Sequence, residues 1–216
     1  MRHKLLLLIL FFTIQSISFA QVNIGFQGGI NSSKLNGDAE PNTAYKSKVG
    51  AIFSAFVDIP VSKSIAISIQ PSYSQEGTKI SHIKKDSYYP VDSLKVKLNY
   101  FSIPVLVKVS SNNKKFYAIG GIESALLLNN ELTYNDGSSE PLDISVNSWN
   151  FSIQFGTGYK FAIGNTILFV EARYAQGLDN ITEDPIVNDL IPRVKSSSYK
   201  LLTGIEIPLT SRKNKL

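Results

Sequence analysis

Cysteine is absent from the 216 residues of this chain, so no disulfide bond or thiolate site can form. Histidine is scarce, since only His82 remains once His3 is assigned to the N-terminal segment described below. Multi-histidine metal centres and histidine–cysteine catalytic sites are therefore not expected. Long apolar runs are missing after residue 20, so no transmembrane helix is predicted. The formal net charge of +5 is too small to indicate nucleic acid binding.

The N-terminal segment has the pattern of a secretory signal peptide. A basic start at residues 2–4 precedes an apolar run over residues 5–12, and small residues follow at Ser18 and Ala20. The apolar run is too short to span a bilayer comfortably, so cleavage after Ala20 and export are expected. The chain is therefore divided into a signal peptide (1–20), a barrel domain (21–210) and a short basic tail (211–216).

One segment alternates more clearly than any other. From Trp149 to Phe161 every second residue is apolar or aromatic, with Thr157 as the one exception, and the residues between them are polar or glycine. Side chains alternate faces along a strand, so this segment predicts a strand with one apolar and one polar wall. It is long enough to cross a bilayer when tilted, which takes about 9–11 residues. Aromatic residues at both ends of the apolar wall are typical of the two membrane interfaces.

Alternation and turn residues along the rest of the chain predict eight strands and no helix. Five of the prolines fall in or beside the long connections, where strand pairing is not needed, namely Pro41, Pro90, Pro141, Pro185 and Pro192. The expected strands are Val22–Ser32, Lys48–Ile59, Ser64–Lys79, Leu94–Val109, Lys115–Thr133, Asn147–Ala162, Thr166–Leu178 and Ser196–Leu209.

The connections between these strands alternate in length. Short turns are expected near residues 60–63, 110–114 and 163–165, and long polar loops at 33–47, 80–93, 134–146 and 179–195. Transmembrane barrels have an even number of strands, short periplasmic turns and longer outer loops. The sequence therefore predicts an all-β fold, an eight-stranded antiparallel up-and-down transmembrane β-barrel in the outer membrane. A soluble lipocalin-type barrel shows the same alternation of loops with its apolar face inward, and is the main alternative.

The polar wall of the strands carries few charges, and these are of both signs among serine and glycine. A narrow barrel interior needs this composition because every charge there must find a partner. Glu171 and Arg173 lie two apart on one strand and so share a face. We expect an ion-pair network in the lumen, with Arg173 at its centre between carboxylates. Its members are Glu123, Glu171, Arg173, Lys200 and Glu206.

Four segments resemble the PorT-like outer-membrane β-barrel proteins. Residues 98–108 (LNYFSIPVLVK) are similar to that family's Y-x-x-IP-x-L-x-K strand, and residues 23–31 (NIGFQGGIN) to its opening strand. Residues 116–121 (FYAIGG) resemble its fifth strand, and residues 170–178 (VEARYAQGL) its E-x-R-Y-x-x-G-L strand. The resemblance implies an eight-stranded outer-membrane barrel and little biochemistry. The chain departs from many outer-membrane proteins in ending on a basic tail instead of an aromatic residue.

Motifs for catalysis, cofactors and metals are missing. No phosphate-binding glycine pattern occurs, so no cofactor is expected. His82 shares a long loop with Asp86 and Asp92, but this spacing matches no outer-membrane protease or acyltransferase, and no enzymatic activity is expected. The acidic outer loops lack the calcium-binding D-x-[DN]-x-[DN]-G pattern, so no metal site is expected either.

The function expected from the sequence is a structural or interaction role through the extracellular loops. The expected partners are outer-membrane lipid and other envelope proteins, with no nucleic acid. Two alternatives stay open, an accessory component of an outer-membrane secretion system and a soluble periplasmic carrier of an apolar ligand. A barrel of eight strands is filled by its own side chains, so a general porin is not expected.

Overall fold

The computed structural model describes residues 22–37, 43–82, 93–134, 138–140, 147–164, 166–181 and 194–209. The predicted signal peptide, the basic tail and parts of each long loop lie outside these ranges, so the domain limits at residues 20 and 210 stay predictions. The described residues contain no helix of the length and hydropathy that a membrane crossing requires.

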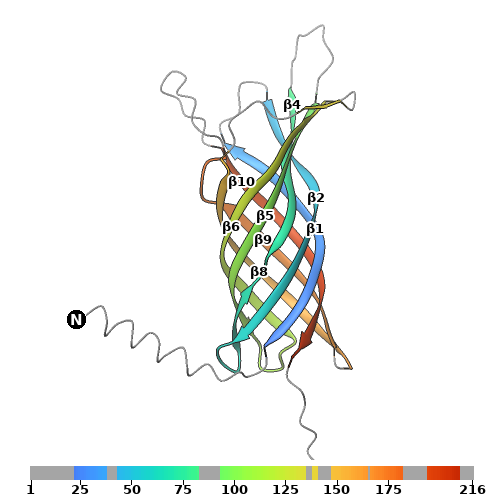
Figure 1. The fold of residues 1–216 in the computed structure, drawn as a ribbon, viewed down its shortest axis with the longest axis vertical. Helices are drawn as coiled ribbons and strands as arrows, with labels where there is room; N and C mark the ends of the chain where they lie inside the picture. Colours follow the sequence, from blue (N-terminus) through green and yellow to red (C-terminus); the bar gives the residue numbers. More distant parts are fainter. Residues whose placement is uncertain are drawn as a thin grey trace, which may run out of the picture.

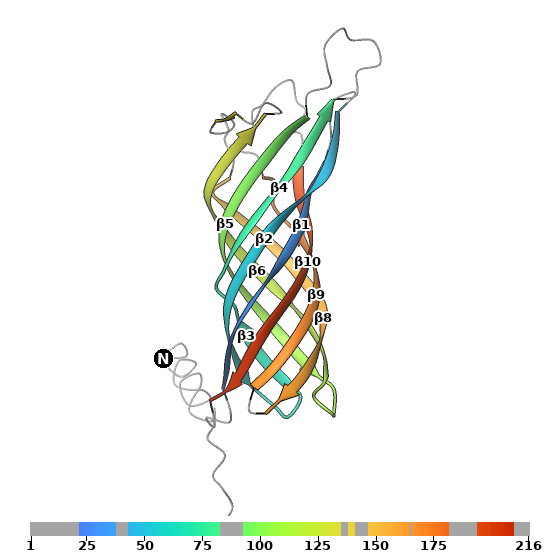
Figure 2. The same cartoon turned by 90° about the vertical axis from the view of Figure 1, so that its right-hand side faces the viewer.

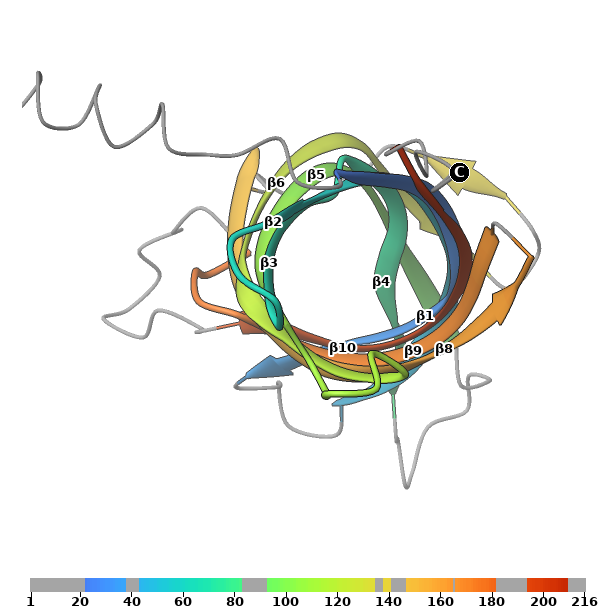
Figure 3. The same ribbon diagram turned by 90° about the horizontal axis from the view of Figure 1, so that it is seen from below.

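The described residues form a closed antiparallel barrel of eight strands, and the predicted fold is confirmed (Figures 1 and 3). Every neighbouring pair is antiparallel, and β1 closes the ring by pairing with β10. The strand segments are β1 (Asn23–Gly37), β2 (Thr43–Pro60), β3 (Ile65–Ile69), β4 (Ser72–His82), β5 (Ser93–Ser110), β6 (Phe116–Thr133), β7 (Ser139–Glu140), β8 (Trp149–Ile163), β9 (Thr166–Gly177) and β10 (Val194–Pro208).

The ten segments make eight barrel strands, because β3 and β4 together form one strand and β7 is a two-residue segment at the end of β6, outside the ring. Both β3 and β4 pair with β2 on one side and with β5 on the other. The break between them falls at Gln70 and Pro71, and proline has no N–H to give to a strand ladder. Backbone hydrogen bonds from Gln70 to Pro104 (3.0 Å) and from Ala55 to Pro71 (3.1 Å) keep the interrupted strand in the ring.

The two ends of the barrel differ in their connections (Figure 2). At the end we call the turn end, β2 ends at Pro60 and β3 begins at Ile65, and Asn23 pairs with Pro208. At the opposite end, which we call the loop end, β1 continues to Gly37 and β2 begins at Thr43. Both strands therefore extend well into the loop predicted at residues 33–47. Strand pairing does not have to stop at the membrane surface, so the strands continue beyond the length that a bilayer requires.

The outer surface near the turn end is an apolar belt. Along β8 the exposed residues include Trp149, Phe151, Ile153 and Phe155. The residues that alternate with them are buried, namely Asn150, Ser152 and Gln154. Aromatic contacts mark both edges of the belt, with Phe116–Tyr159–Phe161 towards the turn end and Phe155–Tyr174–Tyr199 towards the loop end. A soluble carrier would place its apolar face inward, so that alternative is wrong.

The polarity of the barrel changes at the loop end. On β5 the inward residues Val96, Leu98 and Tyr100 are buried, and they pack with Ala125 and Ile181. We call these five residues the loop-end cluster. Partly buried hydrophobic residues complete its packing, namely Leu35, Ile80, Leu127 and Leu132. The outward residues of the same stretch of β5 are polar, so this part of β5 is apolar inside and polar outside, as in a water-soluble protein.

Candidate functional site in the barrel lumen

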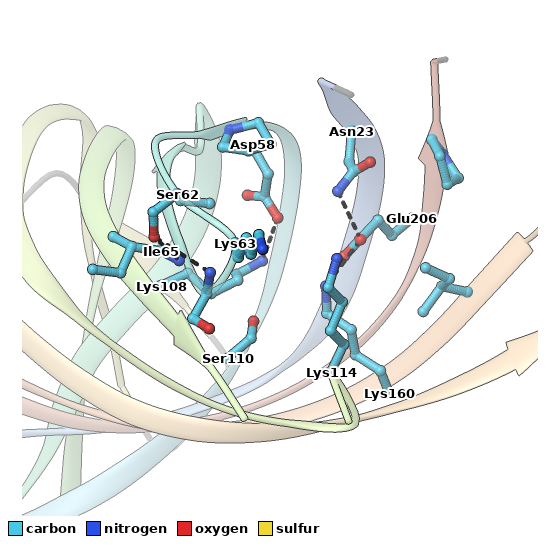
Figure 4. Close-up of a pocket in the computed structure, with 15 residues that line it drawn as sticks. Asn23, Asp58, Ser62, Lys63, Ile65, Lys108, Ser110, Lys114, Lys160 and Glu206 are labelled. Atoms are coloured by element: carbon cyan, nitrogen blue, oxygen red, sulfur yellow. Dashed lines mark hydrogen bonds and ion pairs between the residues drawn. The ribbon is translucent and has the colours of Figure 1, made fainter. Parts of the chain in front are cut away.

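The lumen is an enclosed polar region that the strands bring together, and it opens at the turn end. A recess of about 460 Å³ lies there, with Asp58, Lys108, Lys160 and Glu206 on its walls (Figure 4). Lys63, on the turn between β2 and β3, lines its rim. Two ion pairs therefore face a space that solutes from the turn end can enter.

The first ion pair joins β2 and β5. The Nζ of Lys108 lies 2.6 Å from Oδ2 of Asp58, and both side chains are almost fully buried. The Ser68 hydroxyl donates a hydrogen bond to the other carboxylate oxygen, Oδ1. The Lys108 amine also lies over the rings of Phe56 and Tyr117, 5.3 and 5.0 Å from their centroids. The ring faces add cation–π attraction to an amine that has left water.

The second ion pair joins β8 and β10. The Nζ of Lys160 lies 2.6 Å from Oε2 of Glu206, and the Asn23 amide donates to Oε1 at 3.0 Å. Lys160 approaches the same Tyr117 ring, 5.5 Å from its centroid. A side chain at Gly158 would collide with this ring, so the glycine makes the space in which Tyr117 lies.

Tyr117 connects these pairs to the middle of the lumen. Its hydroxyl donates a hydrogen bond to Oε2 of Glu171 at 2.6 Å, and Oε1 of Glu171 forms an ion pair with Arg173. The Arg173 guanidinium donates to Oε1 of Gln70 at 2.7 Å, and Gln70 donates to Ser68 at 2.8 Å. Since Ser68 donates to Asp58, one hydrogen-bonded network runs from the recess across the barrel.

A further ion pair lies between the middle of the lumen and the loop end. The Nζ of Lys200 is 3.3 Å from Oε2 of Glu123, and the hydroxyls of Ser102 and Ser152 each donate to this carboxylate at 3.2 Å. Towards the loop end Asn31 donates to Glu76 at 3.2 Å. The carboxylates of Asp58, Glu123, Glu171 and Glu206 thus each have a cationic partner, as a low-dielectric interior requires, whereas Glu76 accepts one side-chain hydrogen bond among the described residues.

The structure places all five residues of the sequence-predicted network in the lumen, but in three separate contacts. Arg173 pairs with Glu171, Lys200 pairs with Glu123, and Glu206 pairs with Lys160. Within the described strands Arg173 contacts Glu171 and Gln70, and the expected bridge to Glu123 or Glu206 is not formed. The function of the network stays a prediction.

Sequence reasoning missed the Asp58–Lys108 pair and the role of Tyr117. A signal was available, because Asp58 in FVDIP and Lys108 in LVKVS interrupt strands that are otherwise apolar. A charge on the inward side of such a strand indicates a buried partner. The partner itself could not be read from the sequence, because the two residues are 50 positions apart.

The lumen offers no metal site in the part of the chain that the structure describes, since no group of three or more metal-binding side chains comes together there. Buried polar atoms of Asn31, Asn99, Asn150 and Gln154 lack a hydrogen-bond partner among the described residues. In a polar interior such atoms are hydration sites. The charged groups are paired with one another, so the arrangement suits closure of the barrel more than recognition of a ligand inside it.

Comparisons with known proteins agree with this geometry. The sequence model of a family described as "Outer membrane protein beta-barrel domain" matches residues 15–183. No curated protein matches the chain. Solved structures similar to it include Ail, the attachment invasion locus protein of Yersinia pestis (15% identity, 86% of this chain, 98% of that chain, TM-score 0.43). Neisserial surface protein A is also similar (14% identity, 85% and 96%, TM-score 0.46).

The outer membrane protease OmpT from Escherichia coli is another similar structure (11% identity, 90% of this chain, 98% of that chain, TM-score 0.44). This finding contradicts the prediction that the chain is not an enzyme. That prediction relied on missing motifs, and barrels of this kind include a protease, so missing motifs are no argument against catalysis. The finer resemblance to PorT-like proteins stays a prediction.

Proposed function

The chain belongs to the outer membrane protein beta-barrel domain family and lies in the outer membrane, and from this premise we propose that it is a closed barrel acting through interactions at its loop end. The observation that carries the proposal is the filled lumen. Four buried ion pairs occupy it from the recess to the level of Lys200, and the loop-end cluster follows beyond them.

A sealed lumen leaves the two ends of the barrel as the surfaces that can contact other molecules. The recess at the turn end is small, whereas the loop end carries strand extensions of several residues and the four long connections. The extensions hold these connections above the membrane surface on a rigid support, which is how scaffolds commonly present binding loops. The loop end is therefore the proposed interaction surface.

Conductance across planar bilayers tests the sealed lumen. We expect the unmutated protein to show little or no conductance after insertion. A variant with Tyr117→Ala and Arg173→Ala removes two large side chains from the lumen and should conduct, which verifies that an open barrel would be detected. A large, steady, ohmic conductance in the unmutated protein would contradict the proposal and indicate a channel.

Orientation is tested separately by labelling single cysteines, which is simple because the chain has none of its own. The proposal places the loop end outside the cell and the turn end in the periplasm. Lys95→Cys should react with a membrane-impermeant maleimide on intact cells, and Ser62→Cys should react only after the outer membrane is opened. The opposite pattern would invert the orientation.

A role as an accessory component of a secretion system is the second candidate, favoured by the recess at the turn end. The recess is lined by Lys63, Lys114 and two ion pairs, so a periplasmic partner could present an acidic group to it. A photo-reactive residue at Ser110 should then cross-link to a periplasmic protein. One at Lys95 should not give that product, and the reverse result favours the loop-end function.

A further inference from the structure

Three lysines lie in a row on the outward face of the barrel at its loop end. Lys46 of β2 is directly opposite Lys79 of β4, and Lys79 is directly opposite Lys95 of β5. All three side chains are exposed. Neighbouring strands are about 4.8 Å apart, so three ammonium groups can gather within roughly 10–15 Å. We call these three residues the lysine row.

Such a row is unfavourable for the protein alone, because like charges directly opposite each other destabilise a sheet. None of the three lysines has an ion-pair partner among the described residues. Glu131 lies close to Lys95 on the neighbouring strand β6, but its carboxylate already forms an ion pair with Lys97 at 3.0 Å. The described residues therefore leave the positive charge of the row unneutralised.

The position of the row restricts the anion that can meet it. Phe101 is the last apolar outward residue of β5, and Lys95 lies six residues beyond it. This separation is about 20 Å along the strand at 3.3 Å per residue. With the usual tilt of about 40°, the lysine lies roughly 15 Å above the apolar belt. A phospholipid headgroup layer is only about 5–8 Å thick, so its phosphates do not reach Lys95.

The turn end provides the contrast. Lys63 lies two residues before β3 begins at the exposed Ile65, and Lys115 directly precedes the exposed Phe116. These lysines are at the height of phospholipid headgroups, where basic residues are common. Lysines held at a greater height need an anion that extends farther from the membrane. A glycolipid meets this condition, because its sugars carry phosphate groups well beyond the acyl chains.

We propose that Lys46, Lys79 and Lys95 form a binding site for phosphate groups on the saccharide part of an outer-leaflet glycolipid. The inference rests on the proposed orientation, which the cysteine labelling described above tests independently. Lysine suits this ligand because its flexible stem delivers a point charge to phosphates whose positions vary. Three such contacts would hold the phosphorylated sugars of the glycolipid against β2, β4 and β5 and would neutralise the charge of the lysine row.

The test uses the refolded full-length protein in detergent and a fluorescent bacterial lipopolysaccharide as the probe. The variant carries Lys46→Gln, Lys79→Gln and Lys95→Gln, and the matched control carries Lys63→Gln, Lys114→Gln and Lys115→Gln at the turn end. One lysine near an anionic membrane surface changes affinity about fivefold, so the row variant should bind roughly a hundredfold more weakly. The control should bind within about twofold of the parent.

Two further probes identify the ligand chemistry. Lipopolysaccharide stripped of its phosphates should bind the parent as weakly as intact lipopolysaccharide binds the row variant. Free inositol hexaphosphate should compete only weakly. Equal binding by the row variant and the parent, or tight binding of the stripped glycolipid, would overturn the proposal. Competition by inositol hexaphosphate at the same concentration as lipopolysaccharide would contradict the assignment to a membrane glycolipid.

Discussion

Along β5, the outward residues are apolar in one half of the barrel and charged or polar in the other. Phe101, Ile103 and Val105 are exposed in the apolar belt, whereas Lys95 and Lys97 occupy the outward positions at the loop end. The inward side changes in the opposite sense. All four buried ion pairs lie in the half that carries the belt, and the loop-end cluster is apolar.

The difference shows that each half is built for a different solvent. In water, burying apolar side chains is favourable, so the loop end contains an apolar cluster, which lies beside buried polar residues such as Lys48, Glu76 and Thr78. In lipid, the acyl chains are as apolar as leucine, and burying an apolar group inside the barrel gains little. The interior there can be polar, provided that its groups satisfy one another. Specific hydrogen bonds and ion pairs then hold the strands around the lumen.

The largest effect is expected from breaking an ion pair in the belt half. Arg173→Ala leaves Glu171 buried without its cation, which should lower the free energy of unfolding by about 3–5 kcal/mol. Denaturant unfolding from lipid vesicles measures it. The double variant Glu171→Gln, Arg173→Met removes both charges and should recover most of the loss. A double variant as unstable as Arg173→Ala would mean that lost packing, and not an unpaired charge, causes the effect.

At the loop end the interior should respond as a hydrophobic core. Leu98→Ala deletes a fully buried side chain of the loop-end cluster and should cost about 2–5 kcal/mol. Ser102→Ala, two inward positions away in the belt half, loses hydrogen bonds and should cost only about 1 kcal/mol. The same unfolding assay compares them. Equal losses for the two variants would remove the proposed distinction between the two interiors.

The outward face should show the reverse dependence on position. Ile103→Arg places a charge in lipid and should cost roughly 2–4 kcal/mol if position 103 is near the bilayer midplane. The reciprocal change Lys95→Ile, on the same face of the same strand, should stay within about 0.5 kcal/mol because it lies in water. Folding yield and unfolding in vesicles report both. A harmless Ile103→Arg would contradict the membrane assignment of the belt.

The smallest effect concerns a surface carboxylate at the loop end. A hydrogen bond from Ser139 and the ion pair with Lys97 lower the pKa of Glu131. A lowered pKa in the folded state adds stability at neutral pH, and this is lost as the pH falls through that pKa. Ser139→Ala should raise the pKa of Glu131 towards its ordinary value of about 4.3, measured by NMR titration. An unchanged titration would show that Ser139 has no influence.

The sequence was sufficient for the barrel but not for its internal contacts. Strict alternation in β8 and the alternating loop lengths predicted eight antiparallel strands, because both follow from a tilted strand in a bilayer. The partners of Lys108 and Lys160 were not predictable, since they depend on how the strands are staggered around the ring. The change from Lys97 to Phe101 on the outward face of β5 is present in the sequence. Alternation alone, however, does not show that the two halves of one strand face different solvents.

A single measurement tests the central claim, that the barrel changes solvent between Lys95 and Phe101. Spin labels are placed on single cysteines along β5 from Lys95 to Val109 in lipid vesicles, and their accessibility to oxygen and to a water-soluble relaxing agent is measured. Outward labels at Ile103 and Val105 should be reached by oxygen, and those at Lys95 and Lys97 by the water-soluble agent. Inward labels at Leu98 and Leu106 should be protected from both. Equal access of oxygen to Lys95 and Ile103 would contradict the account.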